Sequence, residues 1–474
     1  MKKQTDLRIQ RLPLKRIFFF LLLLYIGALI IPYVPHKKVS DSYKENFAGR
    51  SFYNNGKGTE RTAYIDDNME ALKYRLRMIE EAEEEIILST FDFHADQAGK
   101  DILSSLQNAA DKGVSVKIIV DGISGLMDMK WNPWFHALAS HENVKIKIYN
   151  PVHLLKPWKI QARLHDKYLI IDEKMYLLGG RNTTNLFLGN YSSSKNIDRE
   201  LFVYETEFSG KTSIHQLLDY FSHVWNHPAS QDFSCCSSWK KAEEKSAALK
   251  IHYEQLKNTY PECYQDWNWE SCTMHTNRIS LLCNPICPSN KEPWMWYSLH
   301  QLMMQGEQIT LNTPYIICGK EMYEDLSALK EKGIRLEIIT NDVSSGANPW
   351  GCTDYLNQKE NIWETGAKVY EFMGKHSSHT KAVLIDSRMS IVGSYNLDMR
   401  STYQDTELML AVDSPELNSI IREEAEKDKT CSRTMEENGS YFYGENYIPR
   451  EISLGKHIFY AVLRILTIPL RRFL

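Results

Sequence analysis

The 474-residue sequence is short of several features that would place it in other protein classes. Nine cysteines are too few for a small disulfide-stabilised scaffold, and 16 prolines with 23 glycines are too few for a fibrous or low-complexity chain. A formal net charge of −4 provides no overall attraction to nucleic acid and leaves room only for a local basic groove. With 43% hydrophobic and 24% charged residues, we expect a folded globular protein with two domains of roughly 200 residues each.

One long run without charge occurs, at residues 17–34 (IFFFLLLLYIGALIIPYV). A helix of this length reaches about 27 Å, close to the thickness of a hydrocarbon core. A cleaved signal peptide is the alternative, but its apolar region is normally shorter and ends at a small-x-small site, for which Ala28 has no partner. We therefore expect an uncleaved membrane anchor over 1–38. The basic residues before the run place the N-terminus in the cytoplasm and the rest of the chain outside; they are Lys2, Lys3, Arg8, Arg11, Lys15 and Arg16.

The C-terminal tail, residues 431–474, ends in a basic amphipathic pattern. Apolar residues recur at helical spacing from Ile458 to Leu470, with Lys456, Arg464 and Arg471 between and beside them. Such a helix either lies at a lipid surface or packs on the protein's own core. The N-terminal anchor favours lipid contact.

The sequence contains an internal repeat. Residues 109–125 and 329–346 both read as a helix end, a Lys-Gly turn, an apolar strand and a loop with glycine. Two related α/β halves are therefore expected, at 66–228 and 293–430, preceded by a polar linker at 39–65.

Between the halves, residues 229–292 are rich in tryptophan and cysteine, and we treat them as an insert. Three states are open to its cysteines: disulfides, favoured outside the cytoplasm; free buried thiols; and a zinc site, disfavoured because the thiols are loosely spaced. The cysteines concerned are Cys235, Cys236, Cys263, Cys272, Cys283 and Cys287.

The same constellation of polar residues occurs once in each half. In the first, LHDKYLIIDEKMYLLGGRN, it comprises His165, Lys167, Asp172, Gly180 and Asn182; in the second, SHTKAVLIDSRMSIVGSYN, it comprises His379, Lys381, Asp386, Ser394 and Asn396. In both, Lys follows His by two residues, Asp by seven and Asn by seventeen. Chance supplies roughly 0.05 copies of the His/Lys/Asp pattern in such a chain, so two copies in matched halves indicate a shared function.

Two such patches suit a phosphodiester. One imidazole attacks phosphorus while the other protonates the departing alkoxide, and the roles then reverse. The two lysines and two asparagines bear on the non-bridging oxygens, where negative charge accumulates, so neither a metal nor another cofactor is expected. We expect Asp172 and Asp386 behind the imidazoles, fixing their orientation and tautomer.

These motifs resemble the two H-x-K-x-x-x-x-D motifs of the phospholipase D superfamily, and bacterial cardiolipin synthases in particular. The resemblance covers roughly residues 66–430 apart from the insert, and is supported by TPYI at 313–316, LDMRS at 397–401 and FSHVWN at 221–226. It implies a pseudo-symmetric fold of two lobes, each a mixed sheet flanked by helices, with both motifs at the lobe interface. It also implies transfer through a phosphohistidine, with His165 as the nucleophile and His379 as the general acid/base.

Such synthases often carry Asn-x-Glu after the Arg-Ser of the second half. Here Asp405 takes the place of the Asn and Glu407 is retained. We assign Glu407 to substrate binding together with Gly180, Asn182, Ser394 and Asn396.

The leading functional hypothesis is a phosphatidyltransferase of the bacterial cell membrane that makes cardiolipin. Phosphatidylglycerol, or alternatively phosphatidylethanolamine, would donate its phosphatidyl group to a second phosphatidylglycerol. A phospholipase D that forms phosphatidic acid uses the same residues and differs only in admitting water. A nuclease is disfavoured by the charge balance and the anchor, and a non-catalytic lipid-binding protein by the presence of both His and both Lys. The expected partners are phospholipid and membrane, not nucleic acid.

Overall fold

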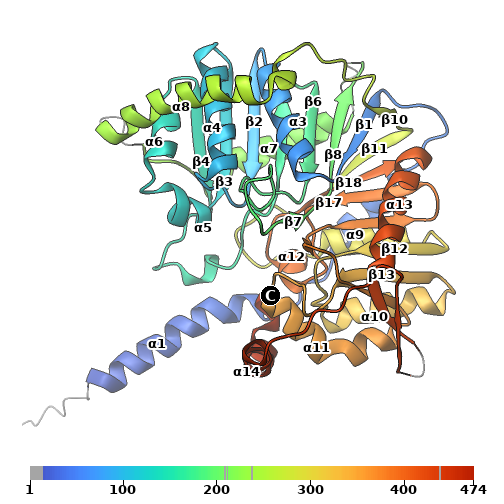
Figure 1. Ribbon diagram of the computed structural model, residues 1–474. Helices are drawn as coiled ribbons and strands as arrows, with labels where there is room; N and C mark the ends of the chain where they lie inside the picture. The colour runs from blue at the N-terminus through green and yellow to red at the C-terminus, as the bar shows by residue number, and fades with distance from the viewer. Residues whose placement is uncertain (1–13, 208–209, 211, 236–238, 437–438) are drawn as a thin grey trace, which may run out of the picture.

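The protein consists of two lobes, one above the other in Figure 1, each built on a nine-stranded mixed sheet flanked by helices. The computed structural model describes residues 14–207, 210, 212–235, 239–436 and 439–474. The two sheets share the same strand order over eight consecutive positions, so the pseudo-symmetric α/β architecture predicted from the repeat is confirmed. The basic residues at positions 2–11 lie outside the described residues.

The first sheet has the order β10-β1-β8-β6-β5-β2-β3-β4-β9. Its strands are β1 (Glu60–Ile65), β2 (Glu85–Thr90), β3 (Ser115–Asp121), β4 (Val144–Tyr149), β5 (Tyr168–Ile171), β6 (Met175–Gly179), β8 (Glu200–Glu205), β9 (Ser230–Asp232) and β10 (Met274–His275). β2, β3 and β4 pair in parallel, and the other pairs are antiparallel. The helices of this lobe are α3 (Asn68–Glu80), α4 (Gln97–Asp111), α5 (Gly122–Ser124), α6 (Pro133–Ala139), α7 (Ser213–Asn226) and α8 (Lys240–Thr259).

The second sheet has the order β11-β18-β17-β16-β12-β13-β14-β19-β20. Its strands are β11 (Arg278–Cys283), β12 (Gln308–Asn312), β13 (Arg335–Asn341), β14 (Lys368–Phe372), β16 (Ala382–Ile385), β17 (Met389–Gly393), β18 (Leu408–Asp413), β19 (Ser432–Met435) and β20 (Tyr441–Tyr443). Its helices are α9 (Trp294–Met303), α10 (Lys320–Glu331), α11 (Pro349–Glu364), α12 (Met399–Tyr403), α13 (Pro415–Thr430) and α14 (Leu454–Leu470). A parallel pair, β7 (Asn196–Ile197) with β15 (Ser377–Ser378), joins the lobes.

The central strands are apolar on both faces. One face of each sheet packs against the helices of its own lobe, and the other face packs against the opposite lobe. In β5, Leu169 and Ile171 pack toward the helices of the first lobe, whereas Tyr168 and Ile170 join a cluster that includes Leu384 of β16. Successive side chains of a strand point to opposite faces, so every residue of β5 is buried. The apolar cluster that contains Tyr168, Ile170 and Leu384 therefore holds the two lobes together, and it fixes the position of the loops at their interface.

Two predicted segments differ from expectation. The linker at 39–65 contains both α2 (Asp41–Ala48) and all of β1, and its Phe47 and Phe52 insert into the core of the second lobe. The segment 229–292 contributes to both lobes: β9 and β10 complete the first sheet, whereas β11 joins the second. It is thus shared between the two sheets and does not form a separate insert.

The prediction of disulfides in this segment is wrong for four of its cysteines. Cys263, Cys272, Cys283 and Cys287 are free thiols. Cys263 is buried in the core of the first lobe and Cys283 lies in the cluster between the lobes, so packing separates them. Cys235 donates to the carbonyl of His136, and Cys236 lies outside the described residues.

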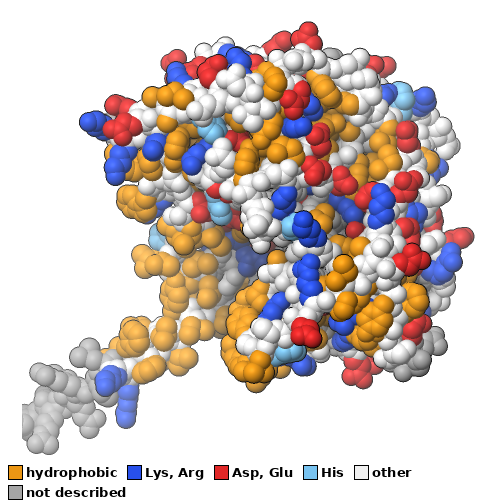
Figure 2. All heavy atoms as spheres, in the orientation of Figure 1, with side chains coloured by type: hydrophobic (Ala, Val, Ile, Leu, Met, Phe, Trp, Pro, Cys, Tyr) orange, Lys and Arg blue, Asp and Glu red, His pale blue; other side chains and the backbone are white. Residues whose placement is uncertain are grey.

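One helix near the N-terminus is long and apolar enough to cross a membrane, among the residues that the structure describes. It spans Lys15–Tyr33 and includes α1 (Leu14–Ile30). Figure 1 shows α1 projecting from the body of the protein, and Figure 2 shows it covered with apolar side chains. This is consistent with the predicted membrane anchor.

Candidate active site

His165 lies in the loop before β5, at the boundary between the lobes. Its backbone N–H donates to Thr406 Oγ1 of the second lobe (3.1 Å), and its Nδ1 lies 2.8 Å from Glu407 Oε1. The edge of the ring faces Phe91 at 5.4 Å between centroids. The histidine of the first motif is therefore fixed by residues of the other lobe.

His379 is held in the equivalent way by residues of the first lobe. It follows β15, and its backbone N–H donates to the carbonyl of Ile197 in the first lobe (2.6 Å). Its Nδ1 lies 2.6 Å from Asp198 Oδ2, and its ring meets Phe187 at 5.0 Å. Since Nδ1 of each imidazole is engaged by a carboxylate, each Nε2 is left for chemistry.

Asp198 and Glu407 occupy equivalent positions in the two lobes. Gly179 pairs with Glu200 in the first sheet, and Gly393 pairs with Met409 in the second; each acid stands two residues before that partner. Each lobe thus supplies the carboxylate for the other lobe's imidazole. Asp198 was missed by the sequence analysis, although one signal existed: an acid just before the buried strand that follows the motif.

Glu407, which we expected to bind substrate, lies buried between His165 and Ser394. Its side chain is fully buried, and its two carboxylate oxygens face His165 Nδ1 and Ser394 Oγ (2.5 Å). Both oxygens are thereby engaged inside the protein, so the carboxylate acts on a ligand only through the imidazole.

Lys167 and Lys381 lie directly beside the imidazoles, as the two-residue spacing on a strand predicts. Each Nζ donates to the backbone carbonyl of the histidine two residues earlier, and Lys381 Nζ also lies 3.7 Å from Asp198 Oδ2. Both side chains are nearly fully buried. Burial lowers the pKa of Lys381 to about 8 and lowers that of Lys167 as well.

The prediction that Asp172 and Asp386 orient the imidazoles is wrong. Asp172 accepts from the backbone N–H groups of residues 83–85 at 2.7–2.9 Å, and Asp386 from those of 307–308 at 2.8–2.9 Å. Both sit in β-hairpin turns with positive φ (50° and 48°), a conformation that Asp tolerates better than most residues. Seven residues beyond the histidine, the strand has carried the chain away from the site, so these aspartates fasten the hairpin to the start of β2 or β12.

The remaining expected residues lie around the same centre. Asn182 is hydrogen-bonded to Asp92, and Asn396 carries a buried Oδ1 without a partner among the described residues. Gly180 lies against Asp198, where any Cβ would clash with the carboxylate. Ser394 is the counterpart of Gly180 and bonds to Glu407. Gly180 and Ser394 therefore each contact one of the two acids.

The pKa of each imidazole is lowered by burial and by lysines of both motifs. Burial and the charges of Lys381 and Lys167 lower the pKa of His379 to about 4, and Asp198 opposes this shift. Burial and Lys167 hold the pKa of His165 well below its usual value, with a contribution from Lys381. Both imidazoles are therefore neutral at pH 7 in the free protein, as a nucleophile requires.

The two carboxylates differ in their ionisation. Burial would raise the pKa of Asp198, but Lys381 and His379 outweigh it and hold the pKa at about 2. Burial raises the pKa of Glu407 to about 8. His379 thus faces a permanent anion, whereas His165 faces a carboxyl that is protonated below pH 8.

Two segments of the chain, residues 76–225 and 299–429, match the protein family described as "Cardiolipin synthase, PLD-like domain", and together they make up more than half of the chain. The chain belongs to this family. The matched segments contain both motifs and both carboxylates, and the resemblance inferred from the motifs is confirmed.

Individual relatives agree with this family. The chain is 26% identical over 400 residues to an uncharacterized protein of Helicobacter pylori, covering 76% of this chain and 77% of that protein. It is 20% identical over 451 residues to cardiolipin synthase C of Escherichia coli (strain K12), covering 83% and 90%, and 24% identical over 368 residues to a cardiolipin synthase of Clostridium perfringens, covering 76% and 68%. The crystal structure of phosphatidylserine synthase of Haemophilus influenzae shares the fold, with a TM-score of 0.62 at 14% identity over 91% of this chain and 99% of that chain.

One group of side chains beside Asn182 has metal-ligand spacing. The donor atoms of Asp92, His94 and Asp128 lie within 4.8 Å of one another. The 3.6 Å contact between His94 Nε2 and Asp128 Oδ1 accounts for part of this group as an ion pair. Spacing alone therefore assigns no metal to it.

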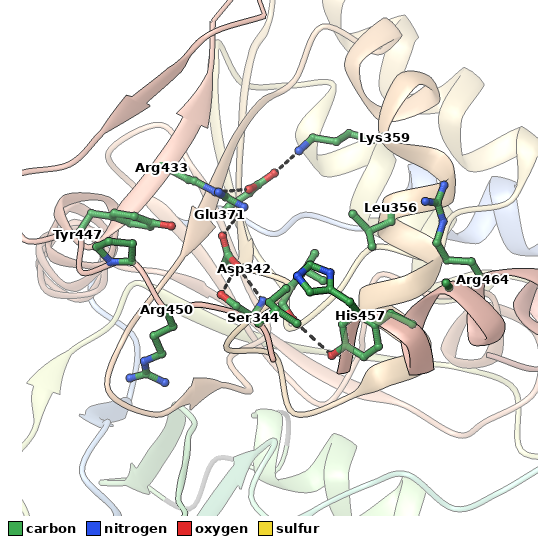
Figure 3. Close-up of a pocket in the computed structure, with 15 residues that line it drawn as sticks. Asp342, Ser344, Leu356, Lys359, Glu371, Arg433, Tyr447, Arg450, His457 and Arg464 are labelled. Atoms are coloured by element: carbon green, nitrogen blue, oxygen red, sulfur yellow. Dashed lines mark hydrogen bonds and ion pairs between the residues drawn. The ribbon is translucent and has the colours of Figure 1, made fainter. Parts of the chain in front are cut away.

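A cavity of about 470 Å³ lies in the second lobe beneath α14, away from both motifs. Figure 3 shows Arg433 and Lys359 converging on Glu371 inside it. Arg433 also pairs with Asp342, so these charges balance within the wall. None of its lining residues belongs to either motif.

Proposed function

We propose that the protein is a membrane-anchored phosphatidyltransferase that makes cardiolipin from phosphatidylglycerol through a phosphohistidine. One observation carries this proposal: two imidazoles with Nδ1 engaged by the opposite lobe's carboxylate, each beside a buried lysine. Family membership supports a phospholipid substrate, and the apolar N-terminal helix supports membrane anchoring.

In the first step, the Nε2 lone pair of His165 attacks the phosphorus of one phosphatidylglycerol. The bond between phosphorus and the glycerol headgroup breaks, and His379 gives its proton to the departing oxygen. Phosphatidyl-His165 remains, and Lys167 and Lys381 hold the non-bridging oxygens. The acid proton is available because substrate binding adds negative charge next to His379, which raises the pKa of its imidazole.

In the second step, the hydroxyl of another phosphatidylglycerol attacks the same phosphorus. His379 takes up the hydroxyl proton, the N–P bond breaks, and cardiolipin leaves with His165 regenerated. The ionised Asp198 suits His379 for this role because an anion stabilises the imidazolium that forms. For the attack by His165, its Nδ1–H donates to Glu407 Oε1, which leaves the lone pair on Nε2 free to react.

The experiment uses full-length protein in mixed micelles with labelled phosphatidylglycerol and a chelator. We expect cardiolipin and glycerol as products, and phosphatidic acid alone would show a hydrolase instead. Adding phosphatidylethanolamine and measuring released ethanolamine identifies the donor.

Substitution of either histidine tests the two-imidazole chemistry. His165→Ala and His379→Ala are each expected to lower turnover by at least about 10³-fold, because each removes an attacking or proton-transferring group. Mass spectrometry of rapidly quenched His379→Ala protein should locate the phosphatidyl group on His165. Near-native turnover by either variant would contradict the mechanism.

A further inference from the structure

The outer face of α14 is apolar and uncovered. Tyr460, Leu463 and Thr467 form the inner stripe, which is buried in contact with α11 and neighbouring loops. On the opposite side, Ile458, Ile465 and Ile468 are 59%, 70% and 64% exposed. The complete exposed set is Leu454, Ile458, Phe459, Val462, Ile465, Leu466, Ile468 and Leu470. A soluble protein rarely leaves an apolar face of this extent in water.

A second exposed apolar group lies beside the base of α1. Leu154 and Leu155 are 68% and 81% exposed, and Trp158 is 45% exposed. Trp158 belongs to the short helix η3 (Pro157–Lys159), which packs against α1. This loop therefore lies where α1 joins the body.

Tyr33 connects all three elements. It is completely buried at the end of the spanning segment, and its hydroxyl donates to the carbonyl of Trp158 (2.8 Å). Its ring meets Phe473, just beyond α14, at 6.3 Å, and its carbonyl accepts from Arg472 Nε. The apolar loop and α14 are thus clamped to the point where α1 leaves the body, and Figure 2 shows the apolar surface continuing from α1 to α14.

Cationic side chains border the face at the level of the cavity beneath α14. Arg464 extends from α14, and Arg450 lies across the cavity (Figure 3). Arg450 donates to the backbone carbonyls of residues 374 and 375, and Arg464 Nε to Asn357 Oδ1. Neither guanidinium forms an ion pair with a carboxylate of the described part of the chain, so both are available to phosphate.

We propose that the outer face of α14 and the loop 154–158 form a docking surface for a phospholipid bilayer. The occupant is a bilayer because the surface is continuous with a helix long enough to span one, and because its apolar stripe is bordered by cations, as in interfacial helices. α14 lies along the bilayer and does not cross it, since its inner stripe is packed on α11. The apolar side chains enter the acyl boundary, and Arg450 and Arg464 meet headgroup phosphates.

Docking brings the bilayer next to the catalytic centre. The backbone N–H of Arg400 donates to the carbonyl of Leu474 (3.0 Å), and Arg400 Nε lies 2.9 Å from Asp405 Oδ2. Asp405 in turn accepts from the backbone N–H of Arg163 (3.1 Å), two residues before His165. The end of the docked element is thus linked through Arg400 and Asp405 to the segment that leads into His165. This inference concerns lipid contact and does not depend on which reaction the protein catalyses.

The test introduces a photoreactive benzoylphenylalanine at single exposed positions of the full-length chain. The protein is reconstituted into vesicles of phosphatidylethanolamine and alkyne-tagged phosphatidylglycerol, irradiated and probed for attached lipid. Ile465 and Leu155 test the surface, and Ile251 on α8 is the matched control, since it is an apolar residue with 63% exposure. Figure 1 shows α8 along the top of the molecule and α14 at the bottom.

We expect at least tenfold more lipid attached at positions 465 and 155 than at 251. Equal labelling at positions 465 and 251 would overturn the proposal. So would attachment of position 465 to a second copy of the chain, because that result would make this face an interface between copies. All three sites are exposed, so the substitutions leave the core intact, and the readout does not require catalysis.

Discussion

At the scale of single residues, the site separates the groups that react from the groups that hold them. The imidazoles of His165 and His379 present Nε2, whereas Asp198 and Glu407 fix Nδ1 from behind. Lys381 is nearly fully buried between His379 and Asp198, and burial lowers its pKa to about 8. A buried ammonium with such a pKa is a strong phosphate ligand at neutral pH and loses its charge just above it.

Activity should therefore fall as the pH rises through about 8, because Lys381 is charged below that pH and neutral above it. In the profile of kcat/KM, which reports the free enzyme, Lys381→Arg should move the alkaline fall upward by more than about one unit at a lower maximal rate. Lys359→Arg, on the far side of the second lobe, should leave the profile unchanged. If the fall near pH 8 persists in Lys381→Arg, the titrating group is instead Glu407, whose pKa is also about 8.

At the scale of elements, the hairpins β5–β6 and β16–β17 carry the motifs, and their turns are tied down by aspartates. Asp172 satisfies three backbone N–H groups at the start of β2, and Asp386 satisfies two at the start of β12. The same motif thus carries the proposed catalytic residues at one end of the strand and an aspartate that holds the hairpin at the other.

Two substitutions separate these roles. Asp172→Ala leaves three N–H groups without their acceptor and strains a positive φ, so we expect a loss of about 3 kcal/mol in the free energy of unfolding. Its turnover per folded molecule should stay within a few-fold of the native rate. Asp198→Asn should melt closer to the native temperature but lose at least about 100-fold in kcat, because the imidazole of His379 loses its anion. Melting curves and kcat measured on the same samples check this, and the reverse pattern would show that Asp172 orients an imidazole.

At the scale of the whole molecule, the C-terminal tail contacts the chain at the point where the spanning segment joins the body. Arg472 and Phe473 clasp Tyr33 at the end of the spanning segment, and Arg471 Nε lies 2.6 Å from the buried Asp354. The N-terminal helix is therefore fixed to the body by the C-terminal tail rather than attached only through the chain that follows it.

Removal of residues 471–474 should loosen this junction. The loss of the Arg471 and Arg472 contacts should cost about 3 kcal/mol of stability and lower the melting temperature. Trypsin should cleave faster at the exposed Lys37 and Lys38, because the junction opens more often. Arg464→Gln, which leaves the tail intact, should change neither measurement. An unchanged melting temperature and an unchanged cleavage rate after truncation would mean that the contacts of Arg472 and Phe473 with Tyr33 do not fix α1 to the body.

The sequence by itself determined the repeat, the two-lobed α/β class, the paired His and Lys residues and the apolar N-terminal helix, because each of these is a local pattern of period, spacing or composition. The partners of the imidazoles were decided only by the tertiary structure. Asp198 and Glu407 lie 181 and 242 residues from the histidines they hold, and no local pattern encodes a contact that exists only when two sheets stack. The motif aspartates were misassigned for the same reason, since their distance from the imidazoles depends on where the strand ends. The thiols of Cys263 and Cys283 are kept apart because they fold into different cores.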